Sequence, residues 1–108
     1  MIVLTRDFKA TVQARVRRDP AFRKALLIEG VEAFLSGDVE TGKAVLRDCI
    51  NATVGFGEVG KALKLSPKSL MRMLGPNGNP QAQNLFEIIA FLLQGEGVKM
   101  KVKLAKAS

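Results

Sequence analysis

"LSPKSLMRMLGPNGNP", residues 65–80, contains a short helix with a start signal at one end and a stop signal at the other. Ser66 can accept hydrogen bonds from the free backbone N–H groups of a first helical turn, and Pro67 is tolerated at the first helical position. A glycine and a proline then end the helix at residues 75–76. The spacing of the apolar residues predicts one buried side, formed by Leu70, Met73 and Leu74.

The opposite side of this helix carries Lys68, Ser69 and Arg72. Lys68 and Arg72 are four positions apart with the same charge, so they repel each other by about 0.2–0.5 kcal/mol. An anionic partner would relieve this repulsion. The alternative interpretation is that both side chains belong to an ordinary solvated face.

The preceding residues extend the pattern to a helix-turn-helix, with helices at 56–63 and 67–74. The first helix of such a motif crosses the second closely, so a small residue is needed in its middle, and Gly60 is placed there. The apolar packing is expected from Val59, Leu63, Leu65, Leu70 and Met73.

In a helix-turn-helix the second helix lies in the DNA major groove, with its first residues at the base edges. Arg72 is suited to donate two hydrogen bonds to guanine O6 and N7. Lys61 and the loop asparagines are better placed to contact phosphates and so to position the domain. The candidate DNA-binding residues are Lys61, Ser66, Lys68, Ser69, Arg72, Asn77 and Asn79.

The rest of the chain predicts an all-α fold of five or six short helices in one domain, residues 1–96, with 5–52 forming the N-terminal helices. A basic helix is expected at 5–18. The next two helices have expected buried sides of Phe22, Leu26, Val31, Phe34 and Leu35, then Ala44, Val45, Cys49 and Ile50. The last helix, 80–94, is apolar almost all round, so it needs cover on two sides, and a second copy of the chain is a source of that cover.

Residues 97–108 change period, and we expect a short C-terminal β-strand there. Its apolar residues, Val98, Met100, Val102 and Leu104, alternate with lysines. A lone strand is unstable, so it would pair with a second copy or with a different protein. The alternative is a frayed tail.

The charge of the chain indicates an anionic partner: a nucleic acid, an acidic protein surface or a membrane face. The chain has 108 residues, 17 basic against 10 acidic, and a formal net charge of +7. Residues 25–54 are the exception, with two basic and five acidic groups, a net of −3. A single cysteine excludes an intrachain disulfide, and neither a secretion signal nor a membrane-length apolar run is evident, so we expect a cytoplasmic protein.

Enzymatic chemistry is not expected, since the chain has no histidine, no carboxylate pair at a useful spacing and no cluster of metal ligands. We therefore expect no cofactor and no metal. "GFGEVG", residues 55–60, fits the G-x-G-x-x-G dinucleotide pattern, but its context has helical spacing rather than a preceding strand. Pro80 also stands where the pattern needs an acidic residue. We interpret these glycines as packing residues.

Residues 51–94 resemble the helix-turn-helix core of lambda-repressor-like (Xre-type) regulators, in particular the HigA-like antidote proteins (antitoxins) of addiction modules. The strings "SPKSLMRML", "GNP" and "NLFEIIAFL" carry the resemblance. It implies a DNA-binding homodimer that represses its own operon and neutralises a small ribonuclease-type toxin. Lys64 departs from the family, which usually has glycine at this turn position, and a left-handed non-glycine residue costs about 1–2 kcal/mol.

A second interpretation assigns the chain to a different functional class. On this view it is a protein-interaction module that binds a toxin or another partner through its last helix and C-terminal strand, without specific DNA binding. A steep salt dependence of DNA affinity separates the two interpretations.

Overall fold

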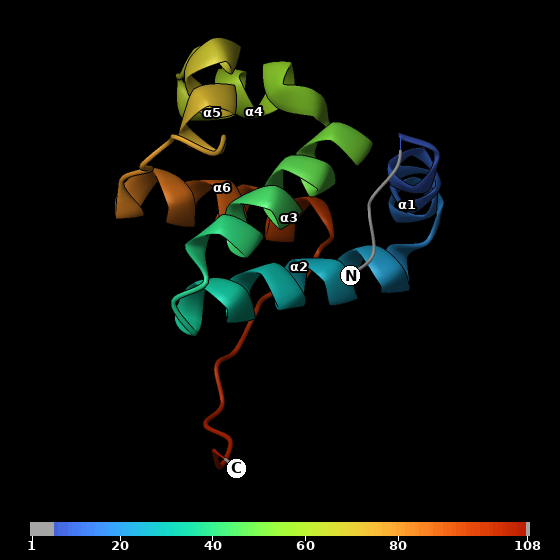
Figure 1. The fold of residues 1–108 in the computed structure, drawn as a ribbon, viewed down its shortest axis with the longest axis vertical. Coiled ribbons are helices and arrows are strands. Elements are labelled where there is room, and N and C mark those ends of the chain that lie inside the picture. The colour runs from blue at the N-terminus through green and yellow to red at the C-terminus, as the bar shows by residue number, and fades with distance from the viewer. Residues whose placement is uncertain (1–5, 108) are drawn as a thin grey trace.

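The computed structural model of the chain describes residues 6–107, which form six α-helices and no strand (Figure 1). The all-α prediction is thus confirmed for these residues. None of the helices among them is long and apolar enough to cross a membrane. In chain order the helices are α1 (Arg6–Arg18), α2 (Pro20–Leu35), α3 (Val39–Ala52), α4 (Gly55–Leu63), α5 (Pro67–Met73) and α6 (Ala82–Gly95).

Short polar caps set the starts of α2 and α3. The Asp19 carboxylate accepts a hydrogen bond from the Phe22 backbone N–H at 3.1 Å, and this bond lowers the pKa of Asp19 below its ordinary value. Asp38 caps α3 in the same way, through the backbone N–H of Thr41. Between the two helices Gly37 has φ 89°, the left-handed conformation expected of a helix-ending glycine.

Glycines allow α2 and α3 to approach each other closely. A Cβ on Gly30 of α2 would lie 2.8 Å from Cγ1 of Val45, and a Cβ on Gly42 of α3 would lie 2.6 Å from the ring of Phe34. Each helix therefore presents a gap where the other presents a bulky side chain. This reciprocal fit was not predicted from the sequence, because the apolar periodicity does not mark glycines as contact residues.

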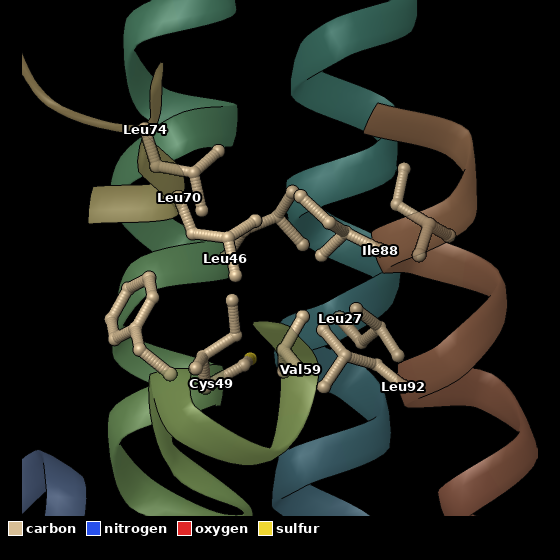
Figure 2. Packing of buried hydrophobic residues seen from close by; sticks show 11 residues of the cluster. Leu27, Leu46, Cys49, Val59, Leu70, Leu74, Ile88 and Leu92 are labelled. Atoms are coloured by element: carbon tan, nitrogen blue, oxygen red, sulfur yellow. The ribbon is translucent and has the colours of Figure 1, made fainter. Parts of the chain in front are cut away.

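The hydrophobic core lies between α2, α3, α4, α5 and α6, whose side chains converge in Figure 2. Its buried members are Leu27, Leu46, Cys49, Ile50, Phe56, Val59, Leu70, Leu74, Ile88, Ile89 and Leu92. The predicted buried side of α2 was partly wrong. Leu35, at the end of that helix, is 66% exposed, whereas Leu27 is buried.

Arg23 of α2 joins three helices at one corner. Its guanidinium forms a paired contact with Glu96, which caps α6, at 2.6 Å from Nε to Oε2 and 3.0 Å from Nη2 to Oε1. Its Nη1 donates to the backbone oxygens of Val16 and Arg17 at the end of α1, at 2.8 and 3.0 Å. Both side chains of the ion pair are largely buried, so this bidentate contact fixes α1 and α6 against α2.

Helix α6 begins at Ala82, two residues later than predicted, and only part of its surface is covered. Ile88, Ile89 and Leu92 are buried, whereas Phe86 is 64% exposed. The single chain thus leaves one side of this apolar helix uncovered. The prediction that a second copy covers it stays a prediction.

The predicted C-terminal strand is absent from the single chain. Residues 98–107 have no regular secondary structure, and Figure 1 shows them running away from the helices at the end of the molecule opposite α4 and α5. Val98 and Met100 are half-buried, while Val102 and Leu104 are 76% and 94% exposed. The alternation of apolar residues with lysines does not by itself form a strand. A strand needs a neighbour to complete its hydrogen bonds, and no neighbouring strand exists among the described residues.

Candidate nucleic-acid interface

Helices α4 and α5 are joined by a tight connection that turns at Lys64. This residue has φ 59° and ψ 43°, and it is the one non-glycine residue with positive φ in the described part of the chain. The backbone N–H of Leu65 then donates to the Gly60 oxygen at 2.9 Å, which closes the end of α4. Lys64 therefore adopts the left-handed conformation despite the cost of its Cβ.

Gly60 is a close-packing position, although the backbone that it approaches is the connection after α4 and the first residue of α5 rather than the middle of α5. A Cβ at this residue would lie 2.5 Å from the backbone oxygen of Leu65, a distance that no side chain tolerates. The rest of the glycine pattern has another function. Gly55 has φ 83° at the very start of α4, and helix α3, not a strand, precedes it. The structure thus lacks the strand that a dinucleotide site requires.

The start of α5 is a capped helix terminus. The Ser66 hydroxyl accepts a hydrogen bond from the Ser69 backbone N–H at 3.1 Å and donates one to the Ser69 hydroxyl at 2.8 Å. Both candidate serines are therefore engaged with each other. Ser66 is exposed and Ser69 half-buried, so their first role is to hold the first turn of α5.

The two sides of α5 differ as the sequence predicted. Leu70 and Leu74 are fully buried, and Met73 is half-buried. Lys68 and Arg72 are both exposed, and neither side chain forms a hydrogen bond or an ion pair with another described residue. Two cations thus protrude side by side from a short helix whose other side is fixed in the core.

The loop after α5 folds back on the end of that helix. The Gly78 backbone N–H donates to the Gly75 oxygen at 3.0 Å, which closes a tight turn. A Cβ on Gly78 would lie 2.2 Å from the backbone oxygen of Arg72, so only glycine fits here. Asn77 and Asn79, on either side of this glycine, are exposed.

Two cations of α3 hold this loop, and the sequence analysis missed both. Lys43 is only 1% exposed, and its Nζ lies 2.9 Å from the backbone oxygens of Gly75 and Gly78 and 2.9 Å from the Glu40 carboxylate. Arg47 donates to the backbone oxygen of Leu74 at 2.5 Å. The Leu74 carbonyl lies at the C-cap of α5, where helical partners run out, and the carbonyls of Gly75 and Gly78 belong to the loop that follows.

A signal for these two residues was present in the sequence. Lys43 and Arg47 are four apart and occupy the same stripe of α3 as the buried Leu46 and Ile50. Cations at buried positions of an amphipathic helix indicate internal acceptors. Interpreting every basic residue as a surface candidate hides this signal.

Groups of side chains that could hold a metal ion are absent from residues 6–107. No three acidic, cysteine or histidine side chains gather there around one point. Burial raises the pKa of the Cys49 thiol to about 12, so it remains protonated and unreactive at neutral pH.

Of the candidate residues, all but the half-buried Ser69 are exposed on or beside the α4–α5 unit: Lys61, Ser66, Lys68, Arg72, Asn77 and Asn79. No model of a protein family, no curated protein and no solved structure matches this chain.

Proposed function

We propose that the protein is a sequence-specific DNA-binding regulator, in which α4 and α5 form a lambda-repressor-like helix-turn-helix and α5 enters the major groove. The observation that carries this proposal is the pair of exposed cations, Lys68 and Arg72, on a helix whose other side is fixed in the core. A rigid helix that presents positive side chains suits both the shape and the charge of the groove.

Each candidate residue has a distinct role in this proposal. Arg72 donates two hydrogen bonds to the O6 and N7 atoms of a guanine, and Lys68 contacts a base or a phosphate at the start of α5. Lys61 and the two loop asparagines contact phosphates on either side. The DNA anion also removes the repulsion between Lys68 and Arg72.

The protein acts as a homodimer in this proposal. The uncovered side of α6, with Phe86 64% exposed, is the surface that a second copy would cover. A two-fold dimer reads two half-sites about 34–36 Å apart, one helical turn of DNA, on an operator that shares its symmetry.

The resemblance to HigA-like antidote proteins supports a more specific role, as an antitoxin that represses its own operon and neutralises a ribonuclease-type toxin. A small open reading frame next to this gene would be the candidate toxin. Co-expression tests this part of the proposal: the neighbouring gene alone should arrest growth, and the pair should not. Arrest that persists with both genes expressed would remove the antitoxin role while leaving DNA binding intact.

A salt series on the gene's own upstream DNA tests the DNA-binding proposal. If about six phosphates are contacted, log K should fall against log salt with a slope of about −5. An unrelated duplex of equal length should bind more weakly at every salt concentration. Equal affinity for the two duplexes, or an affinity that does not depend on salt, would favour the interaction module without specific DNA binding.

A further inference from the structure

A second exposed feature of the molecule is a groove between α2 and the C-terminal tail, residues 98–107. Its volume is about 620 Å³. The apolar lining comes from Leu27, Ile28, Val31 and Leu35 of α2, Leu93 of α6, and Val98, Met100 and Val102 of the tail. Ile28 is 46% exposed and Leu35 is 66% exposed, so the groove is open to solvent on the α2 side.

The tail that forms one wall of this groove has backbone N–H and C=O groups without backbone hydrogen-bond partners in the described chain. No backbone hydrogen bond joins residues 99–107 to any other described residue, whereas the N–H of Val98 just before them donates to the Leu93 oxygen at 3.1 Å. An unpaired stretch with alternating side chains is a template for an added strand. A strand laid beside it would place its own apolar side chains over Ile28 and Leu35.

The charges around the groove indicate the charge of a strand that would bind there. Its charged lining consists of Lys24, Lys99, Lys101 and Lys103 against the single carboxylate of Glu32. None of these lysines forms an ion pair with a described residue. The tail of a second copy would bring the same lysines, and like charges opposite each other destabilise a strand pair. Lysine on an exposed edge is a common means of preventing self-pairing.

We propose that this groove binds an extended segment of another protein in which apolar and acidic residues alternate. The segment adds to the tail as a β-strand, its apolar side chains fill the groove, and its carboxylates pair with Lys99, Lys101 and Lys103. This inference does not rest on DNA binding, because the tail that lines the groove runs out at the end of the molecule opposite α4 and α5 (Figure 1).

Peptide binding to the full-length protein tests the proposal without a known partner. The probe is a synthetic peptide in which valine and glutamate alternate. One comparison peptide has lysine in place of glutamate, and another has the same composition with the valines and glutamates in separate blocks. Fluorescence anisotropy should show that the alternating acidic peptide binds at least about tenfold more tightly than either comparison peptide, and that salt weakens this binding.

Charge reversal of the tail provides the decisive variant. Lys101→Glu with Lys103→Glu should weaken binding of the acidic peptide by about tenfold and strengthen binding of the lysine peptide. Leu35→Asp, at an exposed position of the groove, should weaken binding of the acidic peptide without a change of tail charge. The matched control is Lys61→Glu with Lys64→Glu on the far side of the molecule, which changes the net charge equally and should leave peptide binding unchanged.

Three results would overturn the proposal. The first is equal binding of the alternating and block peptides. The second is a self-association, measured by sedimentation, that charge reversal of the tail alters, since a second copy would then occupy the groove. The third is a tail variant that loses affinity for duplex DNA but binds the acidic peptide as the parent does.

Discussion

At the scale of single residues, the turn between α4 and α5 depends on Lys64. It adopts a left-handed conformation that glycine takes at no steric cost, and its exposed side chain forms no hydrogen bond or ion pair with the described part of the chain. The conformation is maintained because Gly60 and Leu65 meet directly, with the Leu65 N–H bound to the Gly60 oxygen at 2.9 Å. The strained conformation of Lys64 therefore accompanies the tight turn that brings Leu65 against Gly60.

Lys64→Gly should stabilise the protein, because it removes the Cβ strain. We expect the free energy of unfolding to rise by about 0.5–1 kcal/mol, the strain relieved less the added flexibility of glycine in the unfolded chain. Urea denaturation of the parent and the variant measures this difference. Lys64→Ala is the control, since it keeps the Cβ and should leave stability nearly unchanged. A stabilisation by alanine equal to that by glycine would show that the lysine charge, not the backbone, is the source.

The buried thiol of Cys49 predicts a loss of stability in alkaline solution. Its pKa is about 12 in the folded protein, against an ordinary value of 9.0, because burial disfavours the thiolate. Between these values the unfolded chain releases the proton first, so unfolding becomes easier as pH rises from 9 towards 12.

This contribution should reach about 1.4 kcal/mol per pH unit above the ordinary thiol pKa. Lysines titrate in the same range, so the measurement is the difference between the parent and Cys49→Ala. The variant starts less stable, since it leaves a cavity, but its stability should fall less steeply with pH. If the free energy of unfolding falls equally steeply with pH in the two proteins, the thiol does not contribute to the loss of stability.

At the scale of the elements, side chains of α3 bind the segment of chain in which α5 ends. Lys43 and Arg47 of α3 bind three backbone oxygens of the chain just beyond α5, those of Leu74, Gly75 and Gly78. The loop is thus tied to a central helix of the core rather than left to solvent. Because α5 ends where this loop begins, the same bonds set the direction in which Arg72 protrudes.

Lys43→Met should both destabilise the protein and weaken DNA binding. The variant keeps the apolar stem but removes the Lys43 donor from the half-buried carbonyls of Gly75 and Gly78, of which Gly75 still accepts from the Gly78 N–H, so we expect a loss of about 2–4 kcal/mol in urea denaturation. The control is Glu40→Gln, which removes only the exposed partner of Lys43 and should cost no more than about 1 kcal/mol. Equal effects of the two substitutions would mean that the ion pair, not the pair of carbonyl contacts, holds the loop.

The elements were more predictable than their contacts. The helices predicted at 5–18, 56–63, 67–74 and 80–94 begin and end within two residues of those bounds. Caps such as Asp19, Asp38 and Ser66 are local signals that mark helix starts. The contacts of Lys43 were not predicted, because its partners lie 32 and 35 positions away in the sequence and a local pattern does not indicate such distant contacts. The C-terminal strand was wrong for the opposite reason: its pattern is local, but a strand needs a partner that the described chain does not contain.

At the scale of the whole molecule, two basic surfaces lie at opposite ends. The α4–α5 unit carries Lys68 and Arg72, and the tail carries the lysines of the groove (Figure 1). The residues between them, 25–54, have the acidic balance noted in the sequence. This separation is compatible with the two proposals made above, DNA binding at one end and binding of a protein segment at the other.

Phe86→Glu tests the proposed homodimer. The side chain is 64% exposed in the single chain, so the substitution should leave the fold intact, and a charge at a two-fold contact should separate the copies. Sedimentation equilibrium should show a dimer for the parent and a monomer for the variant. Glu87→Gln, at the neighbouring position, is the control for a change of charge on α6. A variant that remains dimeric would place the interface elsewhere.

The most direct test of the account is the affinity of Arg72→Ala for the gene's own upstream DNA and for an unrelated duplex, measured at one fixed salt concentration. We expect a loss of about 1–3 kcal/mol on the upstream DNA, little change on the unrelated duplex, and an unchanged fold and oligomeric state. Lys106→Ala removes an equal charge at the far end and should preserve the preference for the upstream DNA. If Arg72→Ala binds the upstream DNA as tightly and as selectively as the parent does, α5 is not the element that reads DNA.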